Sequence, residues 1–487
     1  MNLSKDAFGA GDHIEVEVLV IGSGAGGSPT AALLAEAGFD VLIVEEGEWY
    51  DQGSIKPFSL EQMQKQYRSG GVTVALGRPS IAYTEGRCAG GGTEVNSGLY
   101  KRPPHSMLTK WRDGYMIQDL ELDDIDAIAD EIETDLSISY VPGESTLASK
   151  ALARGATNLG WRNSEIPRWM SYPEHGDALS GKRQSMTETY LPRAINAGAI
   201  LSTGIRVERL EMTDATAGAA IVERRDGKAG RISFRHVFVC CGAIHTPALL
   251  QRSGIKGNIG KSLAVHPTVK LSAKFSETIN VDNDVPVHQV TEFFPHSSFG
   301  GSASQAGLLA LALNDNWREF RGQITDWRRM SVYYAAITSE GRGRVISVPG
   351  MRDPVVTYRL TKNDRTLLGV SLGRLALAML AAGAEAVYPS FRGAPVVKRP
   401  ADVARLEAGF SATKASVMSV HLCSTVPMGE DPRLCGADSF GRVHGTTNVR
   451  VNDASLLPSA PGVNPQATVM ALVVRNVRRF IEENVHA

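Results

Sequence analysis

The sequence predicts an α/β fold in which a Rossmann-like nucleotide-binding domain carries an inserted α+β domain. Near the N-terminus, a strand, a glycine turn, a helix and a second strand follow one another within residues 16–44, which is typical of the start of a parallel sheet. Between residues 280 and 400, strand-like segments precede one long helix, an order that indicates an antiparallel sheet backed by helices. The final strand and helix, at 448–451 and 468–483, can return to the first domain.

The first strand, residues 16–21, ends at a turn of the form GxGxxG. Gly22 permits the tight turn, Gly24 lets the backbone approach a pyrophosphate, and Gly27 permits close packing of the following helix on the strand. Glu45 ends the second strand, where its carboxylate can accept hydrogen bonds from ribose hydroxyls and would repel a 2′-phosphate. The pattern predicts a dinucleotide site and disfavours NADP, and it leaves FAD and NAD open.

The middle of the chain is less regular. Residues 51–92 are rich in Gly, Pro and polar residues, and we expect extended loops over the nucleotide domain with one helical patch near 60–67. The other expected elements are helices at 120–136 and 188–197 and strands at 205–210, 219–224 and 231–239, with a hairpin turn at Asp226-Gly227 between the last two strands.

The inserted domain is expected to contain strands at 307–313, 331–339, 345–348 and 355–360, followed by a helix over 364–382. The predicted organisation is a first part of the nucleotide domain at 1–150, a mixed segment at 151–275 returning to it, a substrate-binding domain at 276–410, and a C-terminal part of the nucleotide domain at 411–487.

Composition restricts the possible partners. Lys plus Arg number 51 and Asp plus Glu number 52, so the charge balance gives no reason to expect nucleic acid as a partner. No apolar segment is long enough to span a bilayer, and residues 1–11 lack the features of a signal peptide. The five cysteines show no CxxC spacing, and no His/Asp/Glu cluster has metal-ligand spacing. We therefore expect a cytoplasmic protein without a metal site.

Three further blocks resemble one enzyme family. Residues 86–96 (GRCAGGGTEVN) and 242–255 (GAIHTPALLQRSGI) are similar to the two signatures of the glucose–methanol–choline (GMC) oxidoreductases. The segments 421–429, 452–458 and 461–468 resemble the C-terminal block of the same family. Ala89 and Lys256 depart from the signatures at positions that bear on loop packing more than on chemistry.

The resemblance implies FAD as cofactor and a cholesterol-oxidase-like architecture of two domains. It assigns to the cofactor Gly22, Gly24, Ala25, Gly27, Glu45, Gly91, Gly92, Asn96, Val207, Asp453, Ala454, Pro465 and Gln466. Asp453 is expected near the pyrophosphate or the ribityl chain, and Ala454 near the flavin. Val95 stands where some relatives carry a histidine joined covalently to the flavin. Because valine cannot form that bond, we expect non-covalent FAD.

The resemblance also implies that His421 and Asn464 are the catalytic pair. A neutral imidazole can remove the proton of a substrate hydroxyl while hydride leaves the same carbon for flavin N5. An amide cannot act as such a base, so Asn464 is expected to position the substrate oxygen. His245 and His266 also lie in family-like blocks, and we interpret them as structural or near the cofactor.

The implied activity is oxidation of an alcohol to a carbonyl. The resemblance leaves open whether electrons pass to oxygen or to another acceptor, which alcohol is oxidised (a sugar or glycoside, a steroid or terpenoid, or another secondary metabolite) and the oligomeric state. Two alternatives also stay open. One is a non-redox lyase that cleaves cyanohydrins on the same scaffold. The other is an FAD-containing partner within an electron-transfer or biosynthetic complex.

Overall fold

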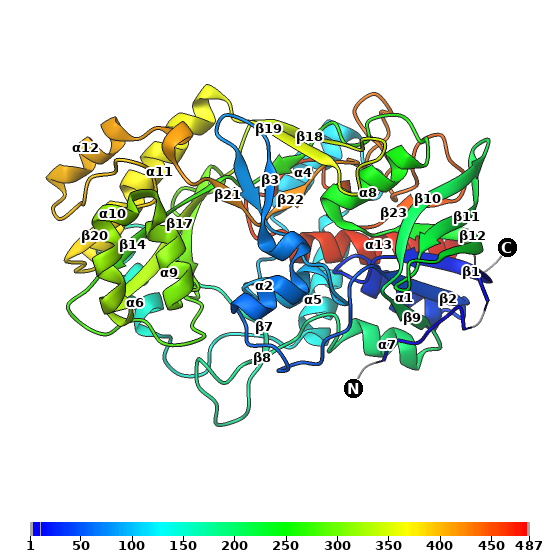
Figure 1. The fold of residues 1–487 in the computed structure, drawn as a ribbon, viewed down its shortest axis with the longest axis horizontal. Coiled ribbons are helices and arrows are strands. Elements are labelled where there is room, and N and C mark those ends of the chain that lie inside the picture. The colour runs from blue at the N-terminus through cyan, green and yellow to red at the C-terminus, as the bar shows by residue number, and fades with distance from the viewer. Residues whose placement is uncertain (1–2, 10, 485–487) are drawn as a thin grey trace.

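A computed structural model of the chain describes residues 3–9 and 11–484 (Figure 1). The segment 1–11, for which no signal peptide is expected, is described except for residues 1, 2 and 10. Two large sheets lie side by side, the first on the right of Figure 1 and the second on the left. The predicted α/β class is confirmed.

The first sheet is built on the predicted strand–turn–helix–strand unit. Within the described residues it has seven strands, in the order β10 (Arg206–Thr213), β11 (Thr216–Glu223), β12 (Ala229–Val239), β1 (His13–Ile21), β2 (Val41–Glu45) and β9 (Ile200–Thr203), with β23 (Val449–Val451) beside β12. The pairs from β12 through β9 are parallel, and β10, β11 and β12 are antiparallel to one another. The four residues at 18–21 are at most 4% exposed, as expected for a parallel strand covered on both faces.

Helices from both the N-terminal and the C-terminal parts of the chain cover this sheet. α1 (Gly27–Glu36) follows the glycine turn, and α13 (Gln466–Asn484) packs against α1 and α5 (Leu122–Asp135). α7 (Tyr190–Asn196) also packs on α1. The C-terminal helix therefore returns to the first domain, as the order of elements predicts.

The second sheet is mostly antiparallel. In the described part of the chain it has nine strands, in the order β3 (Thr73–Ala75), β4 (Ile81–Tyr83), β21 (Met418–Ser419), β14 (Thr268–Lys274), β17 (Met330–Ile337), β16 (Ser297–Ser302), β15 (His288–Val290) and β6 (Asn163–Glu165), with β20 (Ala386–Pro389) beside β14. Its strands come from both inside and outside 276–410. The domain boundaries stay a prediction.

The two faces of this second sheet have different surroundings. On one face, alternate residues such as Val269, Leu271 and Tyr333 join a hydrophobic core with the long helix α11 (Lys362–Ala381), which packs against α6 (Leu147–Asn158). Since side chains alternate along a strand, the residues between them point to the opposite face. That opposite face is partly covered by α9 (Ala306–Leu313) and borders the candidate active site.

Two predictions of secondary structure are wrong. The expected strand at 307–313 is the helix α9, because a continuous run of Ala and Leu has no period to separate strand from helix and both residues favour helix. The expected loops at 51–92 include β3 and β4, which join the second sheet and do not lie only over the nucleotide domain. Strands of three residues leave almost no pattern in a sequence.

The expected strands at 345–348 and 355–360 form β18 (Arg342–Ile346) and β19 (Val355–Arg359), which pair with each other in a separate sheet. The remaining helices are α2 (Leu60–Gln66), α3 (Gly92–Val95), α4 (His105–Tyr115), α8 (Gly242–Arg252), α10 (Trp317–Phe320) and α12 (Ala401–Gly409). The remaining strands are β5 (Ile138–Ser139), β7 (Arg168–Ser171), β8 (Lys182–Arg183), β13 (Ala264–Val265) and β22 (Leu422–Cys423).

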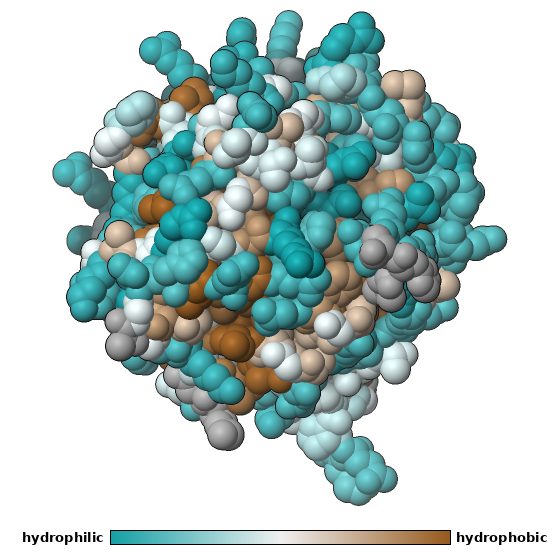
Figure 2. All heavy atoms as spheres, turned by 90° about the vertical axis from the view of Figure 1, so that its right-hand side faces the viewer, coloured by the Kyte–Doolittle hydropathy of each residue, from teal (hydrophilic) through white to brown (hydrophobic). Residues whose placement is uncertain are grey.

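The outer face of the first domain is mainly polar. Figure 2 shows hydrophilic side chains over most of this end of the molecule, with apolar side chains gathered in a smaller area near its centre. Among the described residues, none of the helices combines the length and the apolar character needed to cross a bilayer.

Candidate active site

A cavity of about 880 Å³ is lined by residues from both sheets. Its volume falls within the range of roughly 300–1,000 Å³ that small-molecule and cofactor sites occupy. It brings together most of the residues that the sequence assigns to the cofactor and to catalysis: Gly22, Gly24, Ala25, Glu45, Gly91, Gly92, Asn96, Val207, His421, Asp453, Ala454, Asn464, Pro465 and Gln466. Gly27 lies outside this lining.

The three glycines of the turn have different surroundings. Gly22 has φ +99°, a conformation that L side chains rarely adopt. A Cβ on Gly27 would lie 1.8 Å from the carbonyl oxygen of Gly22, so this residue serves the packing of α1 on β1. A Cβ on Gly24 would meet only the Cα of Gly91, at 4.0 Å, because Gly24 faces the cavity. The turn thus leaves space beside Gly24 for a ligand group that binds to the protein backbone.

Glu45 ties the end of β2 to the glycine turn. One carboxylate oxygen accepts hydrogen bonds from the Ser23 backbone N–H at 3.1 Å and the Ser23 hydroxyl at 2.8 Å, and the other accepts from Gly47 N–H at 2.8 Å. Burial raises the pKa of Glu45 despite these bonds. A carboxylate offers about four acceptor sites, so one is left for a hydroxyl in the cavity.

Asn96 connects the Gly-rich loop to the start of α13. Its amide nitrogen donates to Gln466 Oε1 at 2.5 Å, and its oxygen accepts from Gly98 N–H and from the Arg183 guanidinium, both at 2.8 Å. The hydrogen bond to Gln466 joins two predicted cofactor residues that are 370 positions apart. With these partners the Asn96 side chain positions the loop wall of the cavity.

Asp453 joins the end of β23 to the start of α8. One oxygen accepts from Gly242 N–H at 2.8 Å and from the Thr246 hydroxyl, and the other accepts from Ser455 N–H at 2.7 Å. Burial raises the pKa of Asp453. The carboxylate lines the cavity and holds together two loops of its wall, including the second family-like block.

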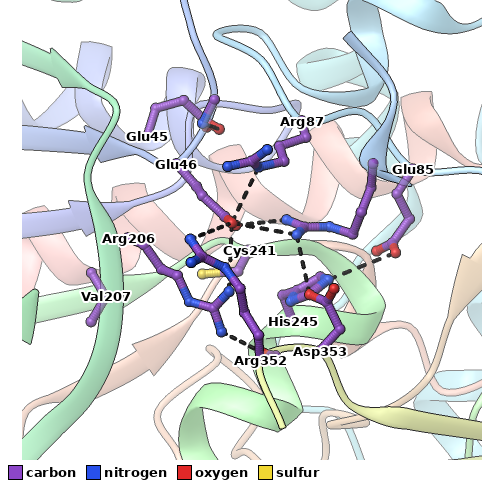
Figure 3. A network of polar contacts seen from close by, with 12 residues as sticks. Glu45, Glu46, Glu85, Arg87, Arg206, Val207, Cys241, His245, Arg352 and Asp353 are labelled. Carbon is purple, nitrogen blue, oxygen red and sulfur yellow. Dashed lines mark hydrogen bonds and ion pairs between the residues drawn. The ribbon is translucent and has the colours of Figure 1, made fainter. Parts of the chain in front are cut away.

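A charged network beside Glu45 and Val207 was not predicted from the sequence (Figure 3). Glu46 forms ion pairs with Arg68 at 2.7 Å and Arg87 at 3.2 Å, and the guanidinium groups of Arg206 and Arg352 lie 3.6 and 3.9 Å from it. Burial alone would raise the pKa of Glu46, but the neighbouring arginines hold that pKa at about 2. No local motif marks this cluster because its members come from distant segments.

The same network contains a buried acid–base pair. Glu85 Oε2 lies 3.8 Å from Nε2 of His245, and both residues line the cavity. Burial raises the pKa of Glu85 to about 7, and burial also lowers the pKa of His245 well below its ordinary value. His245 therefore lies in the polar part of the cavity wall, near the predicted cofactor residues.

His421 lies beside His266 because of strand register. β13 and β22 are antiparallel with Val265 opposite Leu422, so the next residues in the register are His266 and His421. Their Nδ1 atoms are 2.9 Å apart and their rings are nearly perpendicular, at 85°. Burial lowers the pKa of His421 to about 4, so the ring is neutral at physiological pH.

The hydrogen bonds of His266 determine which nitrogen of His421 carries the proton. Gly462 N–H donates to His266 Nε2 at 3.0 Å, and burial keeps the pKa of His266 well below its ordinary value. A neutral His266 that accepts at Nε2 has its proton on Nδ1 and donates it to His421 Nδ1. His421 therefore carries its own proton on Nε2, the nitrogen left for a ligand in the cavity that it lines.

Asn464 is oriented by a polar row on the second sheet. Gln289 Nε2 donates to Asn464 Oδ1 at 3.2 Å and to the Tyr334 hydroxyl at 3.0 Å. Gln289 and Tyr334 reach each other across Gly300, which pairs with both of them. Because its oxygen is occupied, Asn464 has its NH₂ group available as a hydrogen-bond donor to the cavity.

Comparison with known proteins decides the family. A family model for GMC oxidoreductases matches residues 63–268 with its N-terminal domain and residues 339–472 with its C-terminal domain. An uncharacterized GMC-type oxidoreductase of Sinorhizobium fredii is 38% identical over 474 residues, which cover 95% of this chain and 94% of the relative. The chain belongs to the GMC oxidoreductase family. This membership makes it an FAD-dependent oxidoreductase that acts on alcohols.

Other similarities extend over almost the whole GMC oxidoreductase. The long-chain-alcohol oxidase FAO4B of Arabidopsis thaliana is 27% identical over 505 residues, covering 94% of this chain and 66% of that protein. The crystal structure of pyridoxine 4-oxidase from Mesorbium loti superposes with a TM-score of 0.72 at 19% identity, covering 96% of this chain and 99% of the other. This structural likeness confirms the predicted two-domain fold.

The residues of the cavity fit FAD. An added Cβ would meet only the Gly91 Cα, at 4.0 Å, on Gly24, and nothing within 4 Å on Gly92. This open space suits close backbone approach to a phosphate and to a planar ring. The polar wall around Glu45 and Val207 suits the adenosine end of the cofactor. His421 and Asn464 line the same cavity, where the flavin end of the cofactor would meet the substrate.

Proposed function

We propose that this GMC oxidoreductase oxidises the hydroxyl-bearing carbon of its substrate to a carbonyl, with His421 removing the hydroxyl proton and Asn464 holding the oxygen. One observation carries the proposal. His421 and Asn464 line the same cavity, and each has one side-chain polar atom held by the protein while the other is left for a ligand. Bound FAD supplies the acceptor for the hydride that leaves the carbon.

The proton step requires the second tautomer of the His421–His266 pair. To take a proton at Nε2, His421 must first carry its own proton on Nδ1. From there the N–H donates a hydrogen bond to His266 Nδ1. His266 then carries a proton on Nε2, where it faces Gly462 N–H, and that hydrogen bond is lost. A lost buried hydrogen bond costs about 1–3 kcal/mol, or roughly 5- to 150-fold in rate.

A positioned general base raises the reaction rate by about 10²- to 10⁴-fold. Most of that range lies above the rate lost in reaching the second tautomer. General-base catalysis at His421 therefore outweighs the exchange of tautomers. Asn464 NH₂ donates a hydrogen bond to the substrate oxygen as negative charge develops on it, and a single such donor contributes about 10²- to 10³-fold. Similarity to a long-chain-alcohol oxidase supports an alcohol as the substrate class.

The test is anaerobic mixing of the FAD-loaded protein with a panel of primary and secondary alcohols, followed by admission of air. We expect at least one alcohol to bleach the flavin absorbance at a rate that depends on alcohol concentration. Recovery of the absorbance in air would identify oxygen as an acceptor, and no recovery would identify a dehydrogenase. If no alcohol reduces the flavin, the proposal fails and a non-redox lyase becomes the better reading.

A further inference from the structure

Lys270 is a charged residue that the reaction described above does not use. It lies in the middle of β14, between Val269 and Leu271, whose side chains belong to the hydrophobic core under α11. The alternation along the strand therefore directs Lys270 to the other face, where it lines the active-site cavity. Tyr334 is its cross-strand partner and belongs to the polar row that orients Asn464.

The ammonium group of Lys270 has almost no protein partner. Within the part of the chain that the structure describes, its one hydrogen bond is to the Ser302 hydroxyl at 3.5 Å, the long limit of such contacts, although an ammonium has three N–H donors. Among the described residues, Lys270 forms no ion pair with a carboxylate, whereas Lys274 on the same strand pairs with Asp326 at 2.6 Å. Burial lowers the pKa of Lys270 to about 8. The side chain is half-buried, and a cation that has lost part of its water is costly unless it is paired.

The cavity that Lys270 faces is lined by several apolar side chains as well as by serine hydroxyls. Leu308 and Leu311 come from α9, Val332 from β17, and Val417 and Val420 from the segment before His421. Leu311 is 61% exposed and Val420 is 57% exposed while both line the cavity, so they also meet solvent at its edge. These walls suit a molecule whose body is largely hydrocarbon.

We propose that the alcohol oxidised by this protein carries a carboxylate that pairs with Lys270, joined by an apolar body to the hydroxyl held at His421 and Asn464. This inference rests on the proposed alcohol oxidation. Lys270 is four residues from His266, the partner of His421, so their Cα atoms are at most about 13 Å apart. The hydroxyl and the carboxylate would therefore lie at opposite ends of a medium-length chain.

The first experiment compares ω-hydroxy carboxylates with their methyl esters and with n-alkanols of equal length, using anaerobic reduction of the FAD-loaded enzyme. We expect kcat/KM to be about tenfold or more higher for the carboxylate than for its ester, the effect of one good ionic contact. Lys270→Met should remove this preference by raising KM for the carboxylate, so that the kcat/KM values for the carboxylate and its ester become equal. Lys270→Arg should retain most of the preference. Lys274→Met is the matched control and should behave as wild type.

A second experiment does not depend on turnover. Octanoate is titrated into the oxidised holoenzyme and its binding is followed by perturbation of the flavin absorbance. We expect Lys270→Met to weaken octanoate binding by about tenfold or more relative to wild type and Lys274→Met. Equal use of carboxylate and ester by the wild type, together with octanoate binding that is indifferent to Lys270, would overturn the inference and leave alcohol oxidation intact. Octanoate binding that requires Lys270 in a protein whose flavin no alcohol reduces would instead overturn the proposed function.

Discussion

The two ends of the active-site cavity are built differently. At the cofactor end, Glu45, Asn96 and Asp453 are each held by three hydrogen bonds from the protein, so few polar atoms are left over. At the substrate end, His421 and Lys270 are each held at one point and have polar atoms left for a ligand. The first end is preorganised for one resident group, and the second is suited to molecules that arrive and leave.

This difference shows where substitutions should affect structure and where they should affect chemistry. A side chain at the cofactor end supports loops of the fold, so its loss should change FAD binding or folding. His421 and Lys270 each have one side-chain hydrogen bond among the described residues, so the loss of either should change rates and leave the fold intact. The following predictions test this division, beginning with the largest expected effect.

Two substitutions in the glycine turn should have different effects: Gly27→Ala should impair folding, and Gly24→Ala should impair cofactor binding. The Cβ of Gly27→Ala would lie 1.8 Å from the Gly22 carbonyl oxygen, so we expect a cost above the roughly 1–3 kcal/mol of ordinary overpacking and little folded protein. Gly24→Ala has open space and should fold with a normal Tm for the apoprotein but bind FAD at least about tenfold more weakly. Thermal unfolding and flavin absorbance measure the two effects. Equal stability of the two variants would contradict the division of roles.

His421→Ala should slow flavin reduction by about 10²- to 10⁴-fold, the range of a general base, while FAD remains bound. Rapid-mixing measurement of flavin reduction gives the rate, and the ratio of flavin to protein absorbance reports the bound cofactor. His444→Ala is a control because that ring hydrogen-bonds Gly429 O and does not line the cavity. A reduction rate in His421→Ala close to that of the wild type would show that the base is misassigned.

His266→Leu should slow flavin reduction by roughly 5- to 150-fold, less than loss of His421. In the reactive tautomer His421 Nδ1–H donates to His266, and the leucine leaves that N–H without an acceptor, a cost of about 1–3 kcal/mol when it is buried. His266→Gln restores an acceptor and a donor and should recover part of the rate. A positioning role also predicts a changed pH dependence of kcat in His266→Leu. An unchanged pH profile together with an unchanged rate would show that His266 only fills space.

The pH dependence of flavin reduction should be weak near neutrality. Burial lowers the pKa of His421 to about 4, so the neutral form that can accept a proton is fully populated above that value and is lost only as pH falls through about 4. We expect the limiting rate to change less than about twofold between pH 6 and 8, whereas an unperturbed histidine with a pKa near 6.5 would cause a clear decline below that pH. A titration near 6.5 that disappears in His421→Ala would contradict the lowered pKa.

FAD should separate from the wild-type protein on denaturation. This prediction requires no substitution. Val95 lines the cavity at the position where some relatives carry a histidine bonded to the flavin, and a valine side chain offers no nucleophile. Acid precipitation should leave the yellow flavin in the supernatant and none in the pellet. Flavin retained in the pellet would show attachment through another residue.

Much of the proposed cofactor end can be predicted from the sequence because its signals are local. The turn from Gly22 to Gly27, the carboxylate of Glu45 and the block ending at Asn96 each depend on backbone conformations and spacings within a few residues. The strand–turn–helix–strand order followed from the same short-range patterns. The class of the second domain was predictable from the order of its elements, but α9 was mistaken for a strand because an apolar run without a period fits both structures.

The sequence by itself determined the family, and it predicted the nucleotide-binding turn and the roles proposed for His421 and Asn464. Only the tertiary structure decided which groups orient them and which groups they leave free. His266 lies beside His421 because β13 and β22 pair in one register, and Gln289 reaches Asn464 from another sheet strand. Lys270 faces the cavity because of the alternation of β14. Strand pairing joins residues that are far apart in the chain, and no local sequence pattern indicates which strands pair or in which register.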